Sequence, residues 1–371
     1  MNLSDTKPAD DLYDATEETE HAAKDLFDWD KITHYVYAVV CVGSIIGIGL
    51  NILCFKTSLS LPRAKSVSSI LMRHLAVWDS AALFYNLIDH GLIRILGIGW
   101  SCQNALIYKI YKMCCMGVRM TAMYHVLAMA LDRMIAIMTP IWHKNNMATK
   151  TSKVVGIMGA SIILFCLFWS SPRLYVFGKQ ENGKCGFAEH SRLLPVAMKW
   201  LIGISTFGMN LVLPHAIFVV ANVVFVQSLN QRKTNTTNAI KKDTNGANKD
   251  PKKMEKVSKT QNNQRSYTLM LFMMTLACTS ASITIGSINI VSFAIGEKTE
   301  VEFLNFDKGH TGFAKFLSGL GDIVGVLNNS MNLLFYMISG SVFRNAFLRA
   351  LRIWVPTKTG VNETGTTSNF Q

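Results

Sequence analysis

Residues 127–137, LAMALDRMIAI, place an acid and a base side by side within an apolar run. Nearly all the residues around Asp132 and Arg133, from 123 to 141, are apolar, so the pair has no polar helix face to share. Ionisable side chains are costly inside a membrane and tend to mark function there. The pair therefore indicates a membrane setting in which its charges have a role.

The composition is that of a membrane protein. The chain has 371 residues, of which 50% are hydrophobic and only 16% are charged, whereas soluble domains carry about 25% charged residues. A membrane-spanning helix needs about 20 apolar residues. Seven runs reach this length, at residues 34–56, 67–88, 103–137, 154–177, 195–227, 266–295 and 312–338. We therefore expect an all-α membrane protein, a seven-transmembrane helix bundle, because seven such runs would be hard to bury in a soluble fold.

The distribution of charge predicts the orientation and the domains. Residues 1–33 hold ten of the 24 acidic residues and no apolar signal-peptide core, which predicts a disordered extracellular arm. Residues 228–265 hold ten Lys or Arg against three acids, which predicts a basic third cytoplasmic loop within a bundle domain at 34–340. Residues 341–371 then form a cytoplasmic tail. The net charge of +13 is thus a topology signal that also attracts anionic membrane lipid, and its division among short segments argues against nucleic-acid binding.

Two of the eight cysteines, Cys102 and Cys185, fall in predicted extracellular segments. The extracellular environment is oxidising, so we expect a disulfide between these two cysteines, with two free surface thiols as the alternative. Asn182 and Gly183 lie between two short runs just before Cys185 and predict a hairpin turn. Asn2 begins an Asn-Leu-Ser sequon and is the expected glycosylation site on the outer arm.

Several residues at matching places in the runs resemble the rhodopsin-like (class A) G-protein-coupled receptors. The residues that carry the resemblance are Asn51, Asp79, Asp132, Arg133, Pro140, Pro214, Asn332 and Tyr336. The seventh run and the residues after it read NNSMNLLFYMISGSVFRNAF, with a hydrophobic residue in place of the family's usual proline. This version is similar to invertebrate neuropeptide receptors of the FMRFamide and myosuppressin type. In the same pattern, Phe343 and Arg344 open a short amphipathic eighth helix.

The resemblance implies a plasma-membrane receptor that binds an extracellular ligand and activates a heterotrimeric G protein without catalysing a reaction. In the resembled family the acid of the Asp-Arg pair holds the arginine at rest, so Asp132 and Arg133 are the expected switch. Arg133 and Ile141 are the expected G-protein contacts. The residues expected to take part in activation are Asp132, Arg133, Asn332, Tyr336, Asp79 and Asn51. For the pair alone, an ion pair that anchors the helix end at the interface is the alternative.

A buried carboxylate lies near the middle of the resembled bundle. In this family Asp79 and Asn328 often hold a sodium ion, which would be a use for a charge that burial otherwise tends to neutralise. Ala122 stands where the family often has serine, so both a sodium ion and a protonated Asp79 are kept as interpretations. No other cofactor is expected.

Three charged residues lie higher in the bundle by the family's geometry. Asp89, Arg119 and Asp322 point into its extracellular half, and two acids with one base suit a peptide that has a basic residue. The amidated Arg-Phe peptides of the resembled receptors have one. We expect Asp89 or Asp322 to pair with the ligand's arginine, with an internal bridge between Arg119 and Asp89 as the alternative.

Some features depart from the family pattern and keep other classes open. Cys102 stands 31 residues before Arg133, so the third helix or its cap must be longer or irregular. The sixth run has no proline, and Asn222 replaces the usual tyrosine of the fifth. A divergent membrane transporter and a receptor for a non-peptide ligand are the alternatives. The Gly-Leu-Gly-Asp motif that ends at Asp322 matches intramembrane aspartyl proteases, but no second membrane aspartate in a Tyr-Asp pair accompanies it.

Overall fold

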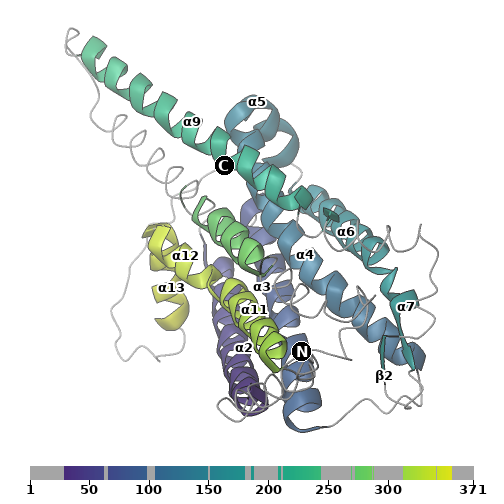
Figure 1. Ribbon diagram of the computed structural model, residues 1–371. Coiled ribbons are helices and arrows are strands. Elements are labelled where there is room, and N and C mark those ends of the chain that lie inside the picture. The colour runs from purple at the N-terminus through teal and green to yellow at the C-terminus, as the bar shows by residue number, and fades with distance from the viewer. Residues whose placement is uncertain are drawn as a thin grey trace, which may run out of the picture.

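The computed structural model is a bundle of long helices with a short two-stranded sheet at one end (Figure 1). It describes residues 29–61, 66–97, 105–148, 151–179, 185–187, 208–209, 212–243, 269, 272–285, 287, 312–339 and 341–352. The long elements are α2 (Trp29–Leu59), α3 (Val67–Asn86), α4 (Ala105–Met138), α6 (Thr151–Ser170), α9 (Leu213–Asp243) and α11 (Gly312–Ser330). The short elements are η1 (Leu87–Ile95), α5 (Pro140–His143), η2 (Lys144–Ala148), α7 (Arg173–Val176), β1 (Phe177–Lys179), β2 (Cys185–Phe187), α12 (Asn332–Ser339) and α13 (Ser341–Arg352).

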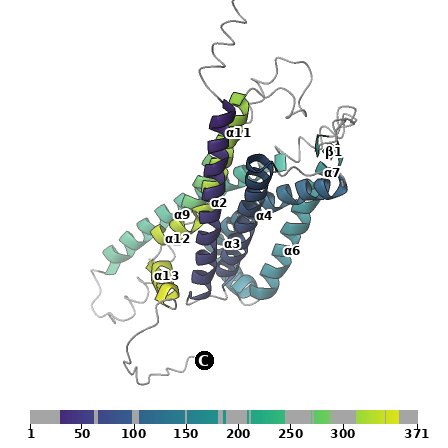
Figure 2. The ribbon, with the colours of Figure 1, turned by 90° about the horizontal axis from the view of Figure 1, so that it is seen from below.

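Three of the described helices are long and apolar enough to cross a membrane, at Lys31–Leu59, Ala105–Met138 and Thr151–Tyr175. Two shorter apolar helices occupy Leu213–Ser228 and Phe272–Ile285, within the predicted fifth and sixth spans. Figure 2 shows α2, α3, α4 and α6 in a row, and each packs against the next. This arrangement agrees with the predicted membrane bundle.

The helices bury polar side chains and expose apolar ones, which is the reverse of a soluble bundle. In α2, Ser44 and Asn51 are buried, whereas Val42 and Ile46 are 58% and 57% exposed. Apolar surface of this extent on a helix side needs an apolar neighbour. We therefore assign the outer faces of the helices to lipid, with polar contacts kept for the interior.

Helix α4 is the longest described element, with 34 residues. At about 1.5 Å per residue it extends about 50 Å, well beyond the ~30 Å hydrocarbon core of a bilayer. Its start at Ala105, soon after Cys102, accounts for the unusual distance from that cysteine to Arg133. Before it, α3 continues directly into the π-helical η1, a wider turn that re-aims the residues following Asn86.

The predicted hairpin is present at the end of the bundle where α6 ends. Strands β1 and β2 pair antiparallel, with Lys179 opposite Cys185. The turn at residues 180–184 and the partner Cys102 lie outside the described residues, so the disulfide stays a prediction. Asn2 lies outside them too.

Helix α9 extends farther than its apolar run. It continues to Asp243, so the first part of the predicted loop at 228–265 is helical. The sequence from 215 to 243 has neither glycine nor proline, and the first of these to follow are Gly246 and Pro251. Since nothing in the segment breaks the helix, it carries on past the apolar residues.

Glycines allow α2 and α11 to pack closely. A Cβ atom at Gly47 would meet the side chain of Ser330 in α11 and would lie 2.7 Å from Leu83 Cδ1. On α11, a Cβ atom at Gly319 would lie 2.7 Å from Val36 Cγ1. Small residues let membrane helices approach in this way. The first glycine of the Gly-Leu-Gly-Asp motif therefore serves helix packing.

Replacing Gly47 by alanine is expected to destabilise the bundle by about 1–3 kcal/mol, because the added methyl group overpacks the contact with Ser330. Gly49→Ala in the same helix is the matched control, since its Cβ would meet nothing within 4 Å. Thermal unfolding of the purified variants measures the difference. Equal unfolding midpoints for the two variants would contradict the packing argument.

Candidate functional site

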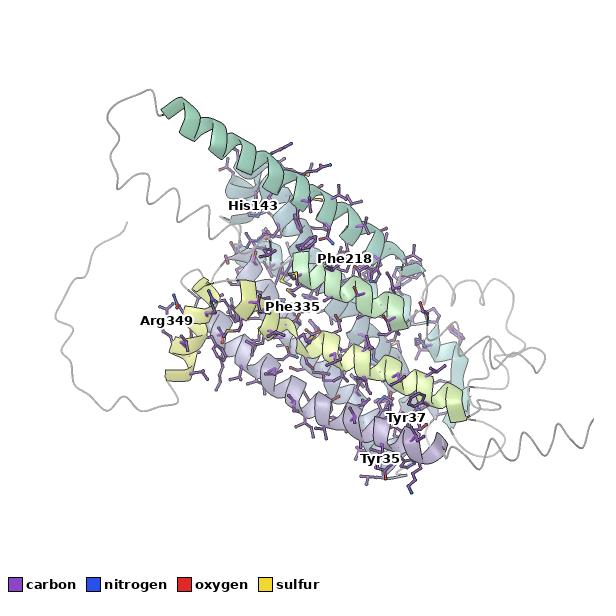
Figure 3. All side chains as sticks on the ribbon, turned by 60° about the vertical axis from the view of Figure 1, so that its left-hand side comes forward. Tyr35, Tyr37, His143, Phe218, Phe335 and Arg349 are labelled. Atoms are coloured by element: carbon purple, nitrogen blue, oxygen red, sulfur yellow. The ribbon has the colours of Figure 1, made fainter. Side chains whose placement is uncertain are left out.

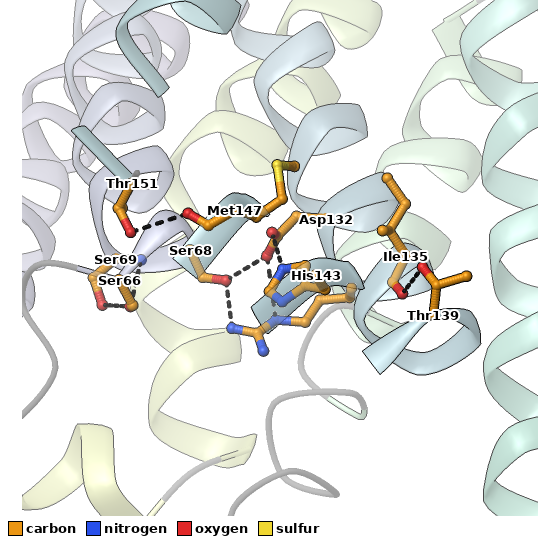
Figure 4. A network of polar contacts seen from close by, with 10 residues as sticks. Ser66, Ser68, Ser69, Asp132, Ile135, Thr139, His143, Met147 and Thr151 are labelled. Atoms are coloured by element: carbon orange, nitrogen blue, oxygen red, sulfur yellow. Dashed lines mark hydrogen bonds and ion pairs between the residues drawn. The ribbon is translucent and has the colours of Figure 1, made fainter. Parts of the chain in front are cut away.

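Four polar side chains meet where α4 ends, at what we call the Asp132 end of the bundle (Figure 4). Asp132 is only 2% exposed, and its Oδ1 lies 2.9 Å from His143 Nε2. Its Oδ2 accepts a hydrogen bond of 2.9 Å from the hydroxyl of Ser68. Arg133 donates through Nη2 to the same hydroxyl, while its Nε lies 3.9 Å from Asp132 Oδ2. The predicted acid and base are therefore linked mainly through a shared serine.

Local sequence explains how Ser68 and His143 reach this place. Ser66 caps α3 by accepting a hydrogen bond from the Ser69 backbone N–H, which places Ser68 in the first helical turn. Pro140 begins α5 just after α4 ends, at a helix position where proline is favoured. The short helix α5 then returns the chain, so that His143 contacts the aspartate 11 residues before it.

Apolar side chains are exposed beside this network. Met138, Ile141 and Trp142 are 63%, 77% and 51% exposed, and they lie at the end of α4 and in α5. A cluster of this kind marks a membrane or protein contact. Ile141, the predicted G-protein contact, is the most exposed of the three.

The other predicted activation residues lie on three contacting helices. Asn51 of α2 donates to the backbone carbonyl of Asn329 at 3.0 Å. Asn332 of α12 donates to the Asp79 carboxylate of α3, and both residues are buried. Tyr336 is fully buried, with its ring centroid 5.1 Å from that of Phe343 in α13. These contacts join the start of the chain's bundle to its last membrane segment.

The predicted ligand residues lie at the opposite end, which we call the Asp322 end. Asp322 Oδ2 lies 3.2 Å from Nε2 of the buried His90, and its side chain is 24% exposed. Asp89 accepts hydrogen bonds from Tyr111 at 2.8 Å and from Lys112 at 3.2 Å. The acids are thus held by different partners, each from a neighbouring helix.

Arg119 makes a different contact from the predicted bridge. Its Nη2 donates to Asn86 Oδ1 at 2.6 Å, and the described ion pairs give it no carboxylate partner. Asp89 forms an ion pair with Lys112, so the alternative of a bridge between Arg119 and Asp89 is absent from the described ion pairs. The ring centroid of Tyr37 lies 5.0 Å from that of His90, the partner of Asp322. Figure 3 shows Tyr37 and His143 at opposite ends of the bundle, so the Asp322 end is separate from the network of Figure 4.

The chain matches the family described as 7 transmembrane receptor (rhodopsin family) over residues 50–332. It belongs to this family. Comparison with curated protein sequences gives no individual match. The predicted all-α, seven-helix membrane fold is confirmed, and the protein is a signalling receptor of the plasma membrane, not an enzyme. The family also implies an extracellular ligand and a G-protein partner.

Sequence reasoning missed several residues of the receptor's two polar groups. His143 was identifiable as the only ionisable residue of α5, close after Pro140, but its contact depends on the turn between α4 and α5. Ser68, His90 and Lys112 gave no signal, because the neighbouring sequence does not show which helix each side chain faces. These residues are recognised only from the structure, because each contacts an aspartate that was predicted from the sequence as a site residue.

The side chains around Asp79 bear on whether the receptor holds sodium. Hard cations prefer oxygen ligands. One oxygen of Asp79 already accepts a hydrogen bond, Ala122 contributes no oxygen, and the thiols of Cys54 and Cys278 lie within electrostatic range of Asp79. Asn328, the other predicted ligand, lies close to the thiol of Cys278. Because these described side chains offer few free oxygens, sodium stays a prediction.

Replacing His143 by phenylalanine is expected to raise the receptor's basal stimulation of nucleotide exchange about 2- to 10-fold. The substitution removes one hydrogen bond from a buried carboxylate, worth about 0.5–1.5 kcal/mol net, and leaves Asp132 less able to hold Ser68 and Arg133 in place. Thr139→Val is the matched control, because Thr139 is exposed between α4 and α5 and its described hydroxyl bond goes to the backbone carbonyl of Ile135. Basal exchange that is unchanged in His143→Phe would show that this contact does not restrain the receptor.

Proposed function

We propose that this receptor carries the signal of an extracellular peptide to a heterotrimeric G protein inside the cell. The observation that supports the proposal most directly is the network of Ser68, Asp132, Arg133 and His143. It places the arginine of the family's switch beside the exposed apolar side chains of α5. In this orientation the Asp132 end is cytoplasmic, and the amino terminus and the Asp322 end are extracellular.

The network is suited to hold Arg133 at rest. Both oxygens of Asp132 are engaged, and Ser68 accepts from Arg133 while donating to Asp132, so the arginine is tied to α3 as well as to α4. Few hydrogen bonds of modest net strength must break to release it. A ligand that binds the released state only a few kcal/mol more tightly is enough to shift the equilibrium.

Arg133 and Ile141 are the proposed contacts for the G protein. Ile141 projects an apolar side chain that is 77% exposed, next to Trp142. Apolar anchors of this kind dominate the energetics of protein interfaces once a partner covers them. The mid-membrane contacts of Asn51, Asp79, Asn332 and Tyr336 are the proposed connection between the two ends.

An amidated neuropeptide is the proposed ligand, on the resemblance of the seventh span to receptors of the FMRFamide and myosuppressin type. Of the two acids, Asp322 is the better partner for the ligand's basic group. Asp89 already has a lysine within 3.2 Å, whereas Asp322 faces His90 and has the more exposed side chain, 24% against 15%. A charge-assisted hydrogen bond to a guanidinium group would be the stabilising contact.

Helix α13 is proposed to lie along the inner surface of the membrane. Phe343 and Ala346 are buried against the bundle, while Arg344 and Arg349 are exposed. Exposed basic residues at this level are attracted to anionic lipid headgroups. Membrane lipid is therefore a proposed partner of this helix.

G-protein activation in cells that express the chain tests the proposed function. We expect amidated neuropeptides from a panel to stimulate nucleotide exchange, and Arg133→Ala to abolish the response at equal surface expression. Arg73→Gln, a substitution on the first half of α3, is the matched control and should respond as the wild type. Substrate flux without any nucleotide exchange would favour the transporter, and a response to non-peptide ligands alone would revise the ligand class.

Asp322→Asn is expected to lower the potency of the active peptide about 10- to 100-fold, because it removes the charge that attracts the basic group. Asp89→Asn is the comparison, and its effect should be smaller because Lys112 already neutralises that acid. Dose-response curves for nucleotide exchange provide the measurement. Unchanged potency in Asp322→Asn would remove this residue from the ligand site.

A further inference from the structure

Three arginines at the Asp322 end, Arg94, Arg119 and Arg173, form no ion pair with a carboxylate among the described residues, and Arg94 donates to the Tyr37 hydroxyl. Arg119 of α4 donates to the neutral amide of Asn86, and Arg173 of α7 takes part in none of the described ion pairs or hydrogen bonds. The acids of this region, Asp89 and Asp322, are paired with Lys112 and His90 instead. Two acids and one base were expected here from the sequence. The structure adds Lys112 and Arg173, so the region carries an excess of positive charge.

Arg173 is placed against α4 by the packing of the helix before it. A Cβ atom at Gly117 would lie 3.2 Å from Ser170 Oγ, so the end of α6 rests on α4 two residues before Arg119. Helix α7 follows at once and packs on α4 as well. The Nε atom of Arg173 is buried and has no hydrogen-bond partner. A buried donor without a partner is unfavourable and needs an explanation.

The side chain of Arg119 lies near that of Arg173. Its guanidinium group and that of Arg173 lie within electrostatic range of each other, and both lie near Cys115. Arg119 is exposed, yet it lies within electrostatic range of Asp89 on η1 and Asp322 on α11. The side chain of Arg119 therefore lies near acids from two other elements of the bundle.

Two neighbouring guanidinium groups inside the bundle repel each other unless a negative charge lies close to both. Like charges repel more strongly in a low-dielectric interior than in water. A planar guanidinium group is also well matched to a carboxylate, which accepts two parallel N–H donors. An anion between Arg119 and Arg173 would satisfy the unpartnered Nε and offset the repulsion.

We propose that Arg119 and Arg173 form a subsite for a carboxylate group of the extracellular ligand. The inference rests on the proposed function and refines its ligand class: the peptide carries an acidic group for these arginines in addition to the basic group for Asp322. The two subsites lie on different helices, α4 with α7 and α11. A bound ligand therefore spans the bundle from one charge to the other.

Matched small probes test the subsite without knowledge of the ligand. N-acetyl-aspartate amide and N-acetyl-asparagine amide differ only in the charge of the side chain. The full chain in lipid nanodiscs is titrated with each probe at constant ionic strength, and the thermal unfolding midpoint is followed. We expect the aspartate probe to raise the midpoint, and to do so at concentrations at least about tenfold lower than the asparagine probe. N-acetyl-alanine, which has only a terminal carboxylate, distinguishes a terminal from a side-chain source of the group.

Variants assign the effect to the two arginines. Arg173→Gln and Arg119→Gln should each lower the affinity for the aspartate probe at least about tenfold, and Arg173→Lys should retain part of it because the charge remains. Arg73→Gln, at a partly exposed arginine in the first half of α3, is the matched control and should bind as the wild type. Should Arg173→Gln fail to unfold cooperatively, Arg119→Gln and Arg173→Lys carry the comparison. Equal stabilisation by the two amide probes, or full binding in both glutamine variants, would overturn the subsite.

The outcomes separate this inference from the proposed function. The unfolding measurement needs neither a G protein nor an agonist. Probe binding that depends on Arg173, together with no nucleotide exchange from any ligand, would support the subsite and count against the signalling proposal. Peptide-stimulated exchange that is equally strong with acidic and neutral peptides, without probe binding, would support the signalling proposal and count against the subsite.

Discussion

A charged group within an apolar bundle must find its partners inside the protein, because lipid offers none. This constraint governs the polar contacts of the receptor. Asp132 is held by a serine and a histidine, Asp79 by an asparagine, Asp89 by a lysine and a tyrosine, and Asp322 by a histidine. Each partner belongs to another element than its aspartate. The acids therefore fix which helices lie together, while close contacts at glycine fix how near they approach.

The sequence was informative wherever the signal is local. Apolar runs of sufficient length predict helices, and the adjacent Asp132 and Arg133 were correctly identified as a feature of one end of the bundle. The glycine and asparagine before Cys185 predicted a hairpin, whose strands are present. These signals depend only on residues that are neighbours in the sequence, so they can be interpreted without knowledge of the three-dimensional arrangement.

Contacts between helices were harder to predict because they depend on how each helix is rotated. The π-helical η1 illustrates this, since its wider turns change which residues face the interior after Asn86. The alternative of a bridge from Arg119 to Asp89 is absent from the described ion pairs, because Asp89 pairs with Lys112. Arg173 was not singled out at all, because a basic residue after a membrane helix is ordinary in sequence. Its significance comes only from the buried, unpartnered Nε beside α4.

The extension of α9 has a mechanical consequence. The helix continues to Asp243, about 15 residues beyond the apolar part that ends at Ser228, which is roughly 22 Å at 1.5 Å per residue. At this length, a tilt of about 10° at the end of the apolar part would move the tip of the helix by about 4 Å. In the proposed orientation this tip lies on the cytoplasmic side, so the extended helix would present such a displacement to the proposed G-protein partner.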